Sequence, residues 1–85
     1  MIFYSADFKR RYKKLPTKLK NKVLERIEVF IADEFDEILG NHKLNGEYEG
    51  CRSIDITGDM RAIYYKIGES SYKFVAVGTH SELYR

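Results

Sequence analysis

The first half of the chain has the hydrophobic spacing of helices. Ile2-Phe3-Tyr4 is a short apolar run, and Ser5 after it is a residue type that caps helix N-termini. Phe8, Tyr12 and Leu15 then recur at spacings of four and three residues. This pattern predicts a strand that leads directly into an amphipathic helix.

A second helix is predicted after Pro16, the only proline in the chain. Proline suits the first turn of a helix because the N–H that it lacks would have no partner there. Apolar residues recur every four positions in this region, at Leu15, Leu19, Val23, Ile27 and Ile31. We expect the two helices to form a hairpin that turns near residues 15–16, with this whole stripe, Ile31 included, in the core.

The second half changes to short apolar runs of the β type. A looser connector, residues 33–46, contains Gly40, Asn41 and Asn45 and separates these runs from the helices. Three strands with hairpin-length turns between them are predicted at Cys51–Ile56, Arg61–Ile67 and Tyr72–Thr79. Cys51 should therefore be a small buried residue of a strand.

These elements predict an α+β fold with the order β-α-α-β-β-β. The helix hairpin should pack on one face of a small, mainly antiparallel sheet, because its apolar stripe needs a surface to cover. In the strand Arg61–Ile67 both alternating sides carry apolar residues. The pattern therefore leaves open which face of the sheet is bare.

Composition indicates one globular domain. The chain has 85 residues, 44% hydrophobic and 14% aromatic, so residues 1–85 should form a single domain with one core. A single cysteine cannot form an internal disulfide, no cationic leader precedes the first strand, and no run approaches the roughly 20 apolar residues of a membrane span. We expect a cytoplasmic protein without a membrane segment.

The net charge of +2 conceals a strong asymmetry. Residues 1–22 carry +7, since only Asp7 opposes eight basic residues, whereas residues 23–39 carry −5. The basic residues are Lys9, Arg10, Arg11, Lys13, Lys14, Lys18, Lys20 and Lys22. Such a block attracts a phosphate backbone, so we predict that it binds RNA, the alternative being a solvated helical face.

Four segments of the C-terminal half gather histidine, aspartate, arginine and tyrosine. They are His42-Lys43-Leu44-Asn45-Gly46, Gly50-Cys51-Arg52-Ser53-Ile54, Gly58-Asp59-Met60-Arg61-Ala62-Ile63-Tyr64 and Gly78-Thr79-His80-Ser81-Glu82-Leu83-Tyr84. Their order and spacing after a helix pair resemble the RelE/ParE superfamily of toxins from prokaryotic toxin–antitoxin modules, especially its YafQ-like mRNA interferases. The resemblance covers essentially the whole chain.

The resemblance implies a microbial-ribonuclease-like fold and a toxin that cleaves mRNA in the ribosomal A site. It implies the ribosome, mRNA and a silencing antitoxin as partners, and chemistry that needs no metal or other cofactor. It also implies catalytic residues. His42 falls where YafQ-like toxins have a catalytic histidine, Asp59 on their active-site aspartate, His80 on their C-terminal histidine, and Tyr84 on an aromatic residue four positions later.

The chain departs from the YafQ-like pattern at two positions. Asp55 stands where those toxins have another histidine, and Met60 replaces an aromatic residue. Arg61 instead matches the phosphate-contacting arginine of RelE-like toxins, and Arg52 is the counterpart of their strand lysines. The resemblance therefore implies a hybrid site.

RNA cleavage without a metal requires three things: a proton taken from the ribose 2′-OH, a proton given to the leaving 5′-oxygen, and neutralisation of the phosphate charge. His80 is the first choice for a proton transfer, because imidazole changes protonation state near neutral pH. Asp59 would support it, and the second transfer falls to His42, Asp55 or Asp59. Arg61 would hold the scissile phosphate.

Other residues would assist in binding. Tyr84 would stack on an unpaired base or donate its hydroxyl, and Arg52 and Arg85 would contact the RNA. The histidines and aspartates lack the close spacing of metal ligands, so we predict no metal site.

Each assignment also has a structural alternative. His80 fits a hydrogen-bonded surface residue, Asp59 fits a turn, Arg61 fits an ion pair with Asp55 or Asp59, and Tyr84 fits simple packing of the C-terminus.

Two other functions fit the resemblance as well: a non-enzymatic ParE-like toxin that inhibits DNA gyrase, and an inactive module that only binds an antitoxin. For the antitoxin, the helix pair and the open sheet are the predicted docking areas. The partner should be acidic where it meets residues 9–22.

Overall fold

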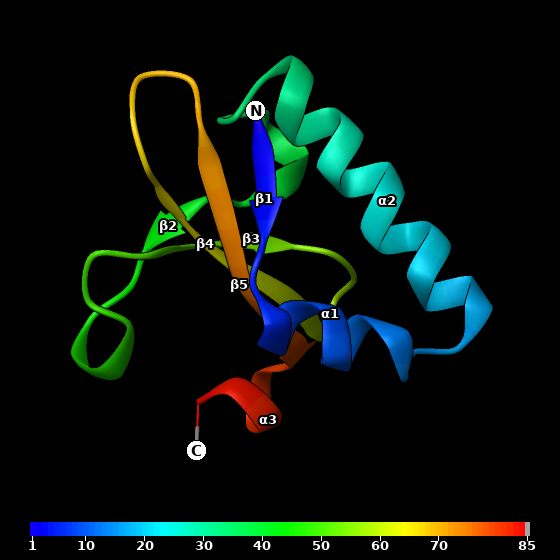
Figure 1. The fold of residues 1–85 in the computed structure, drawn as a ribbon. Coiled ribbons are helices and arrows are strands. Elements are labelled where there is room, and N and C mark those ends of the chain that lie inside the picture. Colours follow the sequence, from blue (N-terminus) through cyan, green and yellow to red (C-terminus); the bar gives the residue numbers. More distant parts are fainter. Residues whose placement is uncertain (85) are drawn as a thin grey trace.

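The computed structural model describes residues 1–84 and has two helices on one side of a five-stranded sheet (Figure 1). The predicted α+β fold is confirmed. The strands are β1 (Ile2–Tyr4), β2 (His42–Lys43), β3 (Arg52–Asp55), β4 (Met60–Lys66) and β5 (Tyr72–Thr79). The helices are α1 (Ala6–Lys13), α2 (Thr17–Ala32) and the single-turn α3 (His80–Leu83). The short strand β2 and the single-turn helix α3 are additions to the predicted order β-α-α-β-β-β.

The sheet has the order β1-β5-β4-β3-β2, with β5 between the first strand and the rest. β1 runs parallel to β5, and the other neighbours are antiparallel. Ser5 connects β1 to the first helix: its N–H donates to Phe74 O at 2.9 Å, and its Oγ accepts the Phe8 N–H at 3.0 Å. Ser5 thus ends β1 with a hydrogen bond to β5 and also caps α1.

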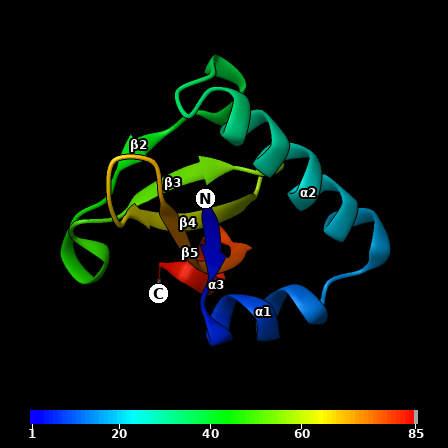
Figure 2. The ribbon, with the colours of Figure 1, turned by 45° about the horizontal axis from the view of Figure 1, so that its top comes forward.

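Helices α1 and α2 lie on the same side of the sheet in the two ribbon views (Figures 1 and 2). Their buried apolar residues belong to one core cluster with residues of the sheet. In α2 the buried residues are Val23, Ile27 and Phe30. The prediction for Ile31 is wrong, since its side chain is 64% exposed whereas Phe30 is 2% exposed. A helix turns every 3.6 residues, so a strict four-residue spacing drifts around the axis and position 30 replaces position 31 in the core.

Phe30 is the centre of an aromatic cluster between α2 and the sheet. Its ring centroid lies 4.7 Å from that of Tyr64, 5.1 Å from that of Tyr72 and 5.2 Å from that of Phe74, each in an edge-to-face arrangement. Edge-to-face pairs of this kind add to the stabilisation that burial alone gives. The cluster fixes α2 to β4 and β5.

A polar network closes one end of this core. Glu34 accepts hydrogen bonds from the hydroxyls of Tyr64, at 2.7 Å, and Tyr72, at 3.1 Å. Asn41 Nδ2 donates to Tyr64 Oη at 2.7 Å, and Arg52 Nε donates to Asn41 Oδ1 at 2.6 Å. Burial raises the pKa of both tyrosines, and the Glu34 carboxylate adds to the rise. The network fastens the segment after α2 to the sheet.

The segment predicted as a loose connector contains short elements. A 3₁₀ turn, η1 (Glu37–Leu39), buries Leu39 completely, and β2 pairs with β3 at the sheet edge. A second 3₁₀ turn, η2 (Gly46–Tyr48), precedes β3. These elements, like α3, are too short for a hydrophobic period to reveal them. Cys51 lies just before β3 and is half-buried, so its predicted place inside a strand is also wrong.

The second face of the sheet has a smaller cover. Ile63, Ala76 and Leu83 form the buried hydrophobic cluster of this face, and half-buried side chains from η2 and the adjoining segments pack against them. Towards the other end of this face Phe3 and Tyr65 remain exposed. Among residues 1–84, no helix combines the length and apolar character that a membrane crossing needs.

Replacing Tyr64 by Phe should lower the free energy of unfolding at pH 7 by about 1–3 kcal/mol, because Glu34 and Asn41 each lose a buried partner. Because the folded chain raises the pKa of Tyr64, the unfolded tyrosine releases its proton first as the pH rises above the usual value of 10.0. Stability due to this group is therefore present below that pH and is lost above it. Urea unfolding at neutral and alkaline pH should show a smaller alkaline loss in Tyr64→Phe than in the parent chain.

The matched control is Tyr65→Phe, which removes the hydroxyl of the neighbouring, exposed tyrosine. It should leave both the neutral stability and the alkaline loss unchanged. If the parent and Tyr64→Phe lost equal unfolding free energy at alkaline pH, the proposed contribution of the polar network to stability would be contradicted.

Candidate active site

The face of the sheet away from α1 and α2 carries Asp55 and Arg61. Met60, Ala62 and Tyr64 belong to the helix-side core, so the alternating residues of β4, Arg61 among them, point to the opposite face. Arg61 lies directly opposite Asp55 in the β3–β4 register, and its Nε is 3.1 Å from Asp55 Oδ1.

The other contacts of Arg61 lie within the β3–β4 hairpin. Its Nη1 donates to the carbonyls of Thr57 at 3.2 Å, Gly58 at 3.3 Å and Met60 at 3.2 Å. The structural alternative for Arg61, the ion pair with Asp55, is therefore present. These contacts stabilise the turn and engage nitrogens that a phosphate would otherwise bind.

His80 and Asp59 meet at the corner where β5 passes into α3. The His80 N–H donates to the Asp59 carbonyl at 3.1 Å, and both side chains are exposed. Thr79 and Glu82 form a reciprocal capping box at the start of α3, with Thr79 N–H donating to Glu82 Oε1 at 2.7 Å. The backbones of His80 and Asp59 thus meet at a corner where the imidazole and the carboxylate are both in contact with solvent.

Tyr84 packs against this corner. Its ring centroid lies 4.7 Å from that of His80 and 6.0 Å from that of Tyr48 in η2. Its hydroxyl is buried and has no hydrogen-bond partner among residues 1–84. The ring therefore flanks His80, while the hydroxyl points into the fold rather than towards a ligand in solvent. Tyr48 is a neighbour of the site that no sequence motif indicated.

Arg11 reaches the same corner from α1. A Cβ built on the buried Gly78 would lie 2.9 Å from Glu82 Oε1 and 3.6 Å from Arg11 Nη1, so the guanidinium lies against the end of β5. Burial raises the pKa of Tyr48, and the nearby Arg11 charge opposes that rise. Arg11 Nε also pairs with Asp7 at 2.9 Å. The sequence predicted Arg11 only as one basic residue of a helix, because its proximity to β5 depends on the tertiary fold.

His42 lies apart from this corner. It is exposed on the edge strand β2, opposite Ser53, and its Nδ1 is 3.0 Å from the Gly40 carbonyl. Three strand spacings separate β2 from β5, which is roughly 14 Å. The structure therefore does not bring His42 and His80 together.

Asp55 occupies the space between the hairpin and the connector. Gly40 has a φ of 52°, and a Cβ there would lie 2.5 Å from Asp55 Oδ2. Only glycine suits this position, since it tolerates the left-handed backbone and leaves room for the carboxylate. Ser53, completely buried on the same strand, has an Oγ without a partner among residues 1–84.

Arg52 lies on the helix side of the sheet. Besides its bond to Asn41, its guanidinium carbon is 5.1 Å from the ring centroid of Phe35. The structure thus places Arg52 in the polar network and away from the His80 corner. Arg85, the other RNA-binding residue predicted near the C-terminus, lies outside the described residues.

The basic residues of the helix pair are divided among several environments. Arg10 pairs with Asp7, and Lys22 Nζ lies 3.4 Å from Glu25 Oε1. Lys14 and Lys18 are exposed. The remaining lysines, Lys9, Lys13 and Lys20, border a groove between the helices.

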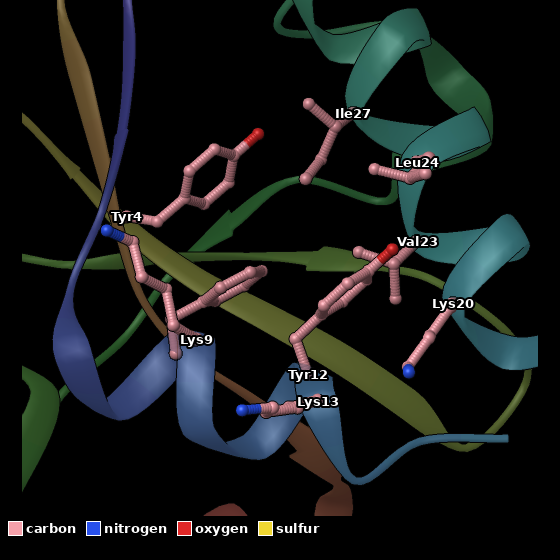
Figure 3. Close-up of a pocket in the computed structure, with 9 residues that line it drawn as sticks. Tyr4, Lys9, Tyr12, Lys13, Lys20, Val23, Leu24 and Ile27 are labelled. Atoms are coloured by element: carbon pink, nitrogen blue, oxygen red, sulfur yellow. The ribbon is translucent and has the colours of Figure 1, made fainter. Parts of the chain in front are cut away.

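This groove has a volume of about 330 Å³ and an apolar floor (Figure 3). Tyr4, Phe8 and Tyr12 line it from β1 and α1, and the α2 residues Val23, Leu24 and Ile27 line it from the other side. Several of these residues belong to the helix-side core, so the groove and the Asp55–Arg61 face lie on opposite sides of the sheet.

The described residues 1–84 contain no group of three or more histidine, cysteine, aspartate or glutamate side chains arranged to hold a metal ion.

Comparison with known proteins gives a consistent result. A family model described as the bacterial toxin of type II toxin–antitoxin systems, YafQ, matches residues 1–85. The crystal structure of YafQ from E. coli strain BL21(DE3) superposes with a TM-score of 0.84 at 21% identity, covering 100% of this chain and 98% of YafQ. No curated protein sequence matches the chain.

Two further solved structures show the same fold. The YoeB/ParE toxin from Agrobacterium tumefaciens matches with a TM-score of 0.78 at 17% identity, covering 93% of this chain and 96% of that toxin. YafQ in the E. coli DinJ–YafQ toxin–antitoxin complex matches with a TM-score of 0.77 at 22% identity, covering 100% and 97%. Because the family model spans the entire sequence, the chain belongs to the YafQ family of toxins from type II toxin–antitoxin systems.

Proposed function

We propose that this toxin is a ribosome-dependent, metal-independent endoribonuclease that cleaves mRNA by attack of a ribose 2′-OH on the adjacent phosphate. The observation that carries the proposal is the corner where the backbones of His80 and Asp59 are hydrogen-bonded, both side chains are exposed, and the Arg11 guanidinium lies beside the end of β5. An imidazole, a carboxylate and a guanidinium there match the three requirements of the reaction. Cleavage would stop translation until the antitoxin binds.

His80 would transfer one of the two protons, because its ring is exposed and is held by Tyr84 on one side. Asp59 would orient the imidazole and stabilise its charged form. Asp55 remains a proposed second proton carrier on the same face, whereas His42 would need the RNA to extend across the sheet to the β2 edge. We assign these roles to Asp55 and His42 because both residues lie on the same face of the sheet as Arg61.

The phosphate would bind to guanidinium groups. Arg61 is the residue proposed from the sequence, and its contacts within residues 1–84 engage Nε and Nη1 and leave Nη2 for a ligand. Arg11 is a second guanidinium at the corner, and we propose that it neutralises charge on the phosphate near His80. The exposed Lys14 and Lys18 would contribute to the grip on ribosomal RNA.

The antitoxin would bind on the helix side. Structures of relatives include a DinJ–YafQ complex and a YoeB–YefM complex from Staphylococcus aureus. The groove between α1 and α2 has an apolar floor and a lysine border, which suits the apolar side of a helix that carries acidic residues. We therefore propose this groove as the antitoxin site.

His80→Ala should reduce cleavage by about 10²–10⁴-fold, the usual effect of losing a general acid or base. Primer extension on cellular mRNA after induction measures it: the parent should leave cuts within translated codons that are absent with His80→Ala. Ser81→Ala, a change at the next position of α3, is the matched control and should cut normally. If the parent arrests growth and leaves mRNA intact, inhibition of DNA gyrase would be favoured instead. If the parent does not arrest growth, an inactive antitoxin-binding module would be favoured.

Arg61→Ala and Arg11→Ala should differ in their effects. Arg61→Ala should lower the free energy of unfolding by about 1–3 kcal/mol, since Asp55 and the hairpin carbonyls lose their donor. Arg11→Ala should change it by less than about 1 kcal/mol, because its pair with Asp7 is solvent-screened. The same Arg11 variant should reduce cleavage by about 10²–10³-fold. Urea unfolding and primer extension on both variants check this, and normal cleavage by Arg11→Ala would refute its assignment.

Leu24→Glu should weaken binding of the cognate antitoxin by about tenfold or more, because it places a negative charge on the apolar floor of the groove. Leu24 is 49% exposed, so the fold should tolerate the change. Ile38→Glu, at an exposed residue that does not line the groove, is the control. Isothermal titration of both variants measures the affinities, and equal values would exclude the groove as the antitoxin site.

A further inference from the structure

Three neighbouring strands carry a row of side chains on the face of the sheet that bears Arg61. Phe3 of β1 and Tyr65 of β4 are both Cα partners of Lys73 in β5, so the three side chains lie side by side across the sheet. Their sequence neighbours Tyr64 and Phe74 belong to the helix-side core. The row Phe3–Lys73–Tyr65 therefore points away from the helices.

The two rings of this row are not used by the core. Phe3 is 45% exposed and Tyr65 is 36% exposed, and the exposed Ile67, which follows β4, lies on the same side as Tyr65 by alternation. A hollow of about 540 Å³ adjoins the row and is lined by Ile2, Phe3, Tyr4, Lys9, Ile67 and Lys73. Exposed apolar groups that gather around a hollow mark a binding surface more often than isolated ones do.

We propose that the row Phe3–Lys73–Tyr65 binds unpaired bases of the RNA whose scissile phosphate lies at the His80 corner, an inference that rests on the proposed function. Bases stack on the flat faces of aromatic rings, and the Lys73 ammonium between the rings pairs with the backbone phosphate. Lys9 at the border of the hollow adds a second positive charge. Two aromatic rings with a cation between them suit single-stranded nucleic acid, whereas a purely apolar patch would suit a protein partner.

The spacing on the sheet agrees with one continuous strand of RNA. Lys73 precedes Gly78 by five residues on β5, which is about 16 Å along the strand. A nucleic-acid strand with stacked bases advances about 3.4 Å per nucleotide, so up to about five nucleotides separate the row from the corner. The Ile63–Ala76 pair lies between the two places, and its cluster is covered in part by Tyr48 and Tyr84. Stacking tolerates every base, so this subsite would lengthen the RNA contact without selecting a sequence.

The test is direct binding of a short fluorescent oligonucleotide with 2′-O-methyl riboses, measured by fluorescence anisotropy at low salt. This RNA has no 2′-OH, so the measurement does not depend on cleavage. Phe3→Ala and Tyr65→Ala should each raise the dissociation constant by about 5- to 150-fold. Tyr65→Phe should restore binding because it keeps the ring, and Lys73→Gln should reduce the slope of log affinity against log salt by about 0.7.

The control variant is Ile31→Ala, which removes an exposed apolar side chain on the helix side and should bind RNA like the parent. Thermal unfolding of each variant checks that the fold is intact. Unchanged affinity in both alanine variants, or no RNA binding by the parent, would overturn the proposal. So would variants that keep RNA binding and lose antitoxin binding, since the row would then dock a protein.

The test of the row Phe3–Lys73–Tyr65 can be distinguished from the test of the proposed nuclease activity. A parent chain that cuts mRNA while Phe3→Ala and Tyr65→Ala bind the oligonucleotide normally would refute the row alone. A parent chain that leaves cellular mRNA intact would refute the nuclease, whatever the anisotropy shows.

Discussion

The fold depends on the hydrogen-bonding requirement of β5. No residue of this strand is exposed and half of its residues are buried, so its backbone groups need partners on both edges. β4 supplies them on one edge and β1, from the other end of the chain, on the other. Because Ser5 both bonds to β5 and caps the first helix, that pairing also fixes where α1 starts. The place of Arg11 near the end of β5 follows from the same pairing, so a sheet contact between distant segments determines the composition of the candidate site.

Much of this architecture was predictable because it is periodic. The stripe of Val23 and Ile27 and the alternation along β4 and β5 repeat often enough to identify a helix and strands. The failures have physical causes as well. Phe30 replaced Ile31 because a helix turn is shorter than four residues. The two-residue β2 and the single-turn α3 are stabilised by their neighbours rather than by their own sequence, so no local pattern identifies them.

The candidate site shows the same division. The family resemblance indicated His80 and Asp59 as candidates, because both residues fall at strand ends in recognisable segments. The hairpin bonds of Arg61 could not, since Thr57, Gly58 and Met60 offer backbone carbonyls that carry no sequence signal. Arg52 and Arg61 lie on opposite faces of the sheet because side chains alternate between the two faces along a strand. An error of one residue in the predicted register would therefore place each arginine on the wrong face.

The groove between α1 and α2 and the His80 corner occupy opposite sides of one thin sheet. An inhibitor bound only in the groove would leave the His80 corner open to solvent. Binding in the groove and blocking the His80 corner would then be separate events. Complete silencing by a direct block would need a second stretch of the inhibitor that passes around the molecule, whose extents are 32 × 28 × 25 Å. At about 3.3 Å per extended residue, roughly eight or nine residues would cover the 28 Å dimension. An antitoxin shortened by that length would remain bound while the toxin stayed active, which makes the two halves of inhibition separable by truncation.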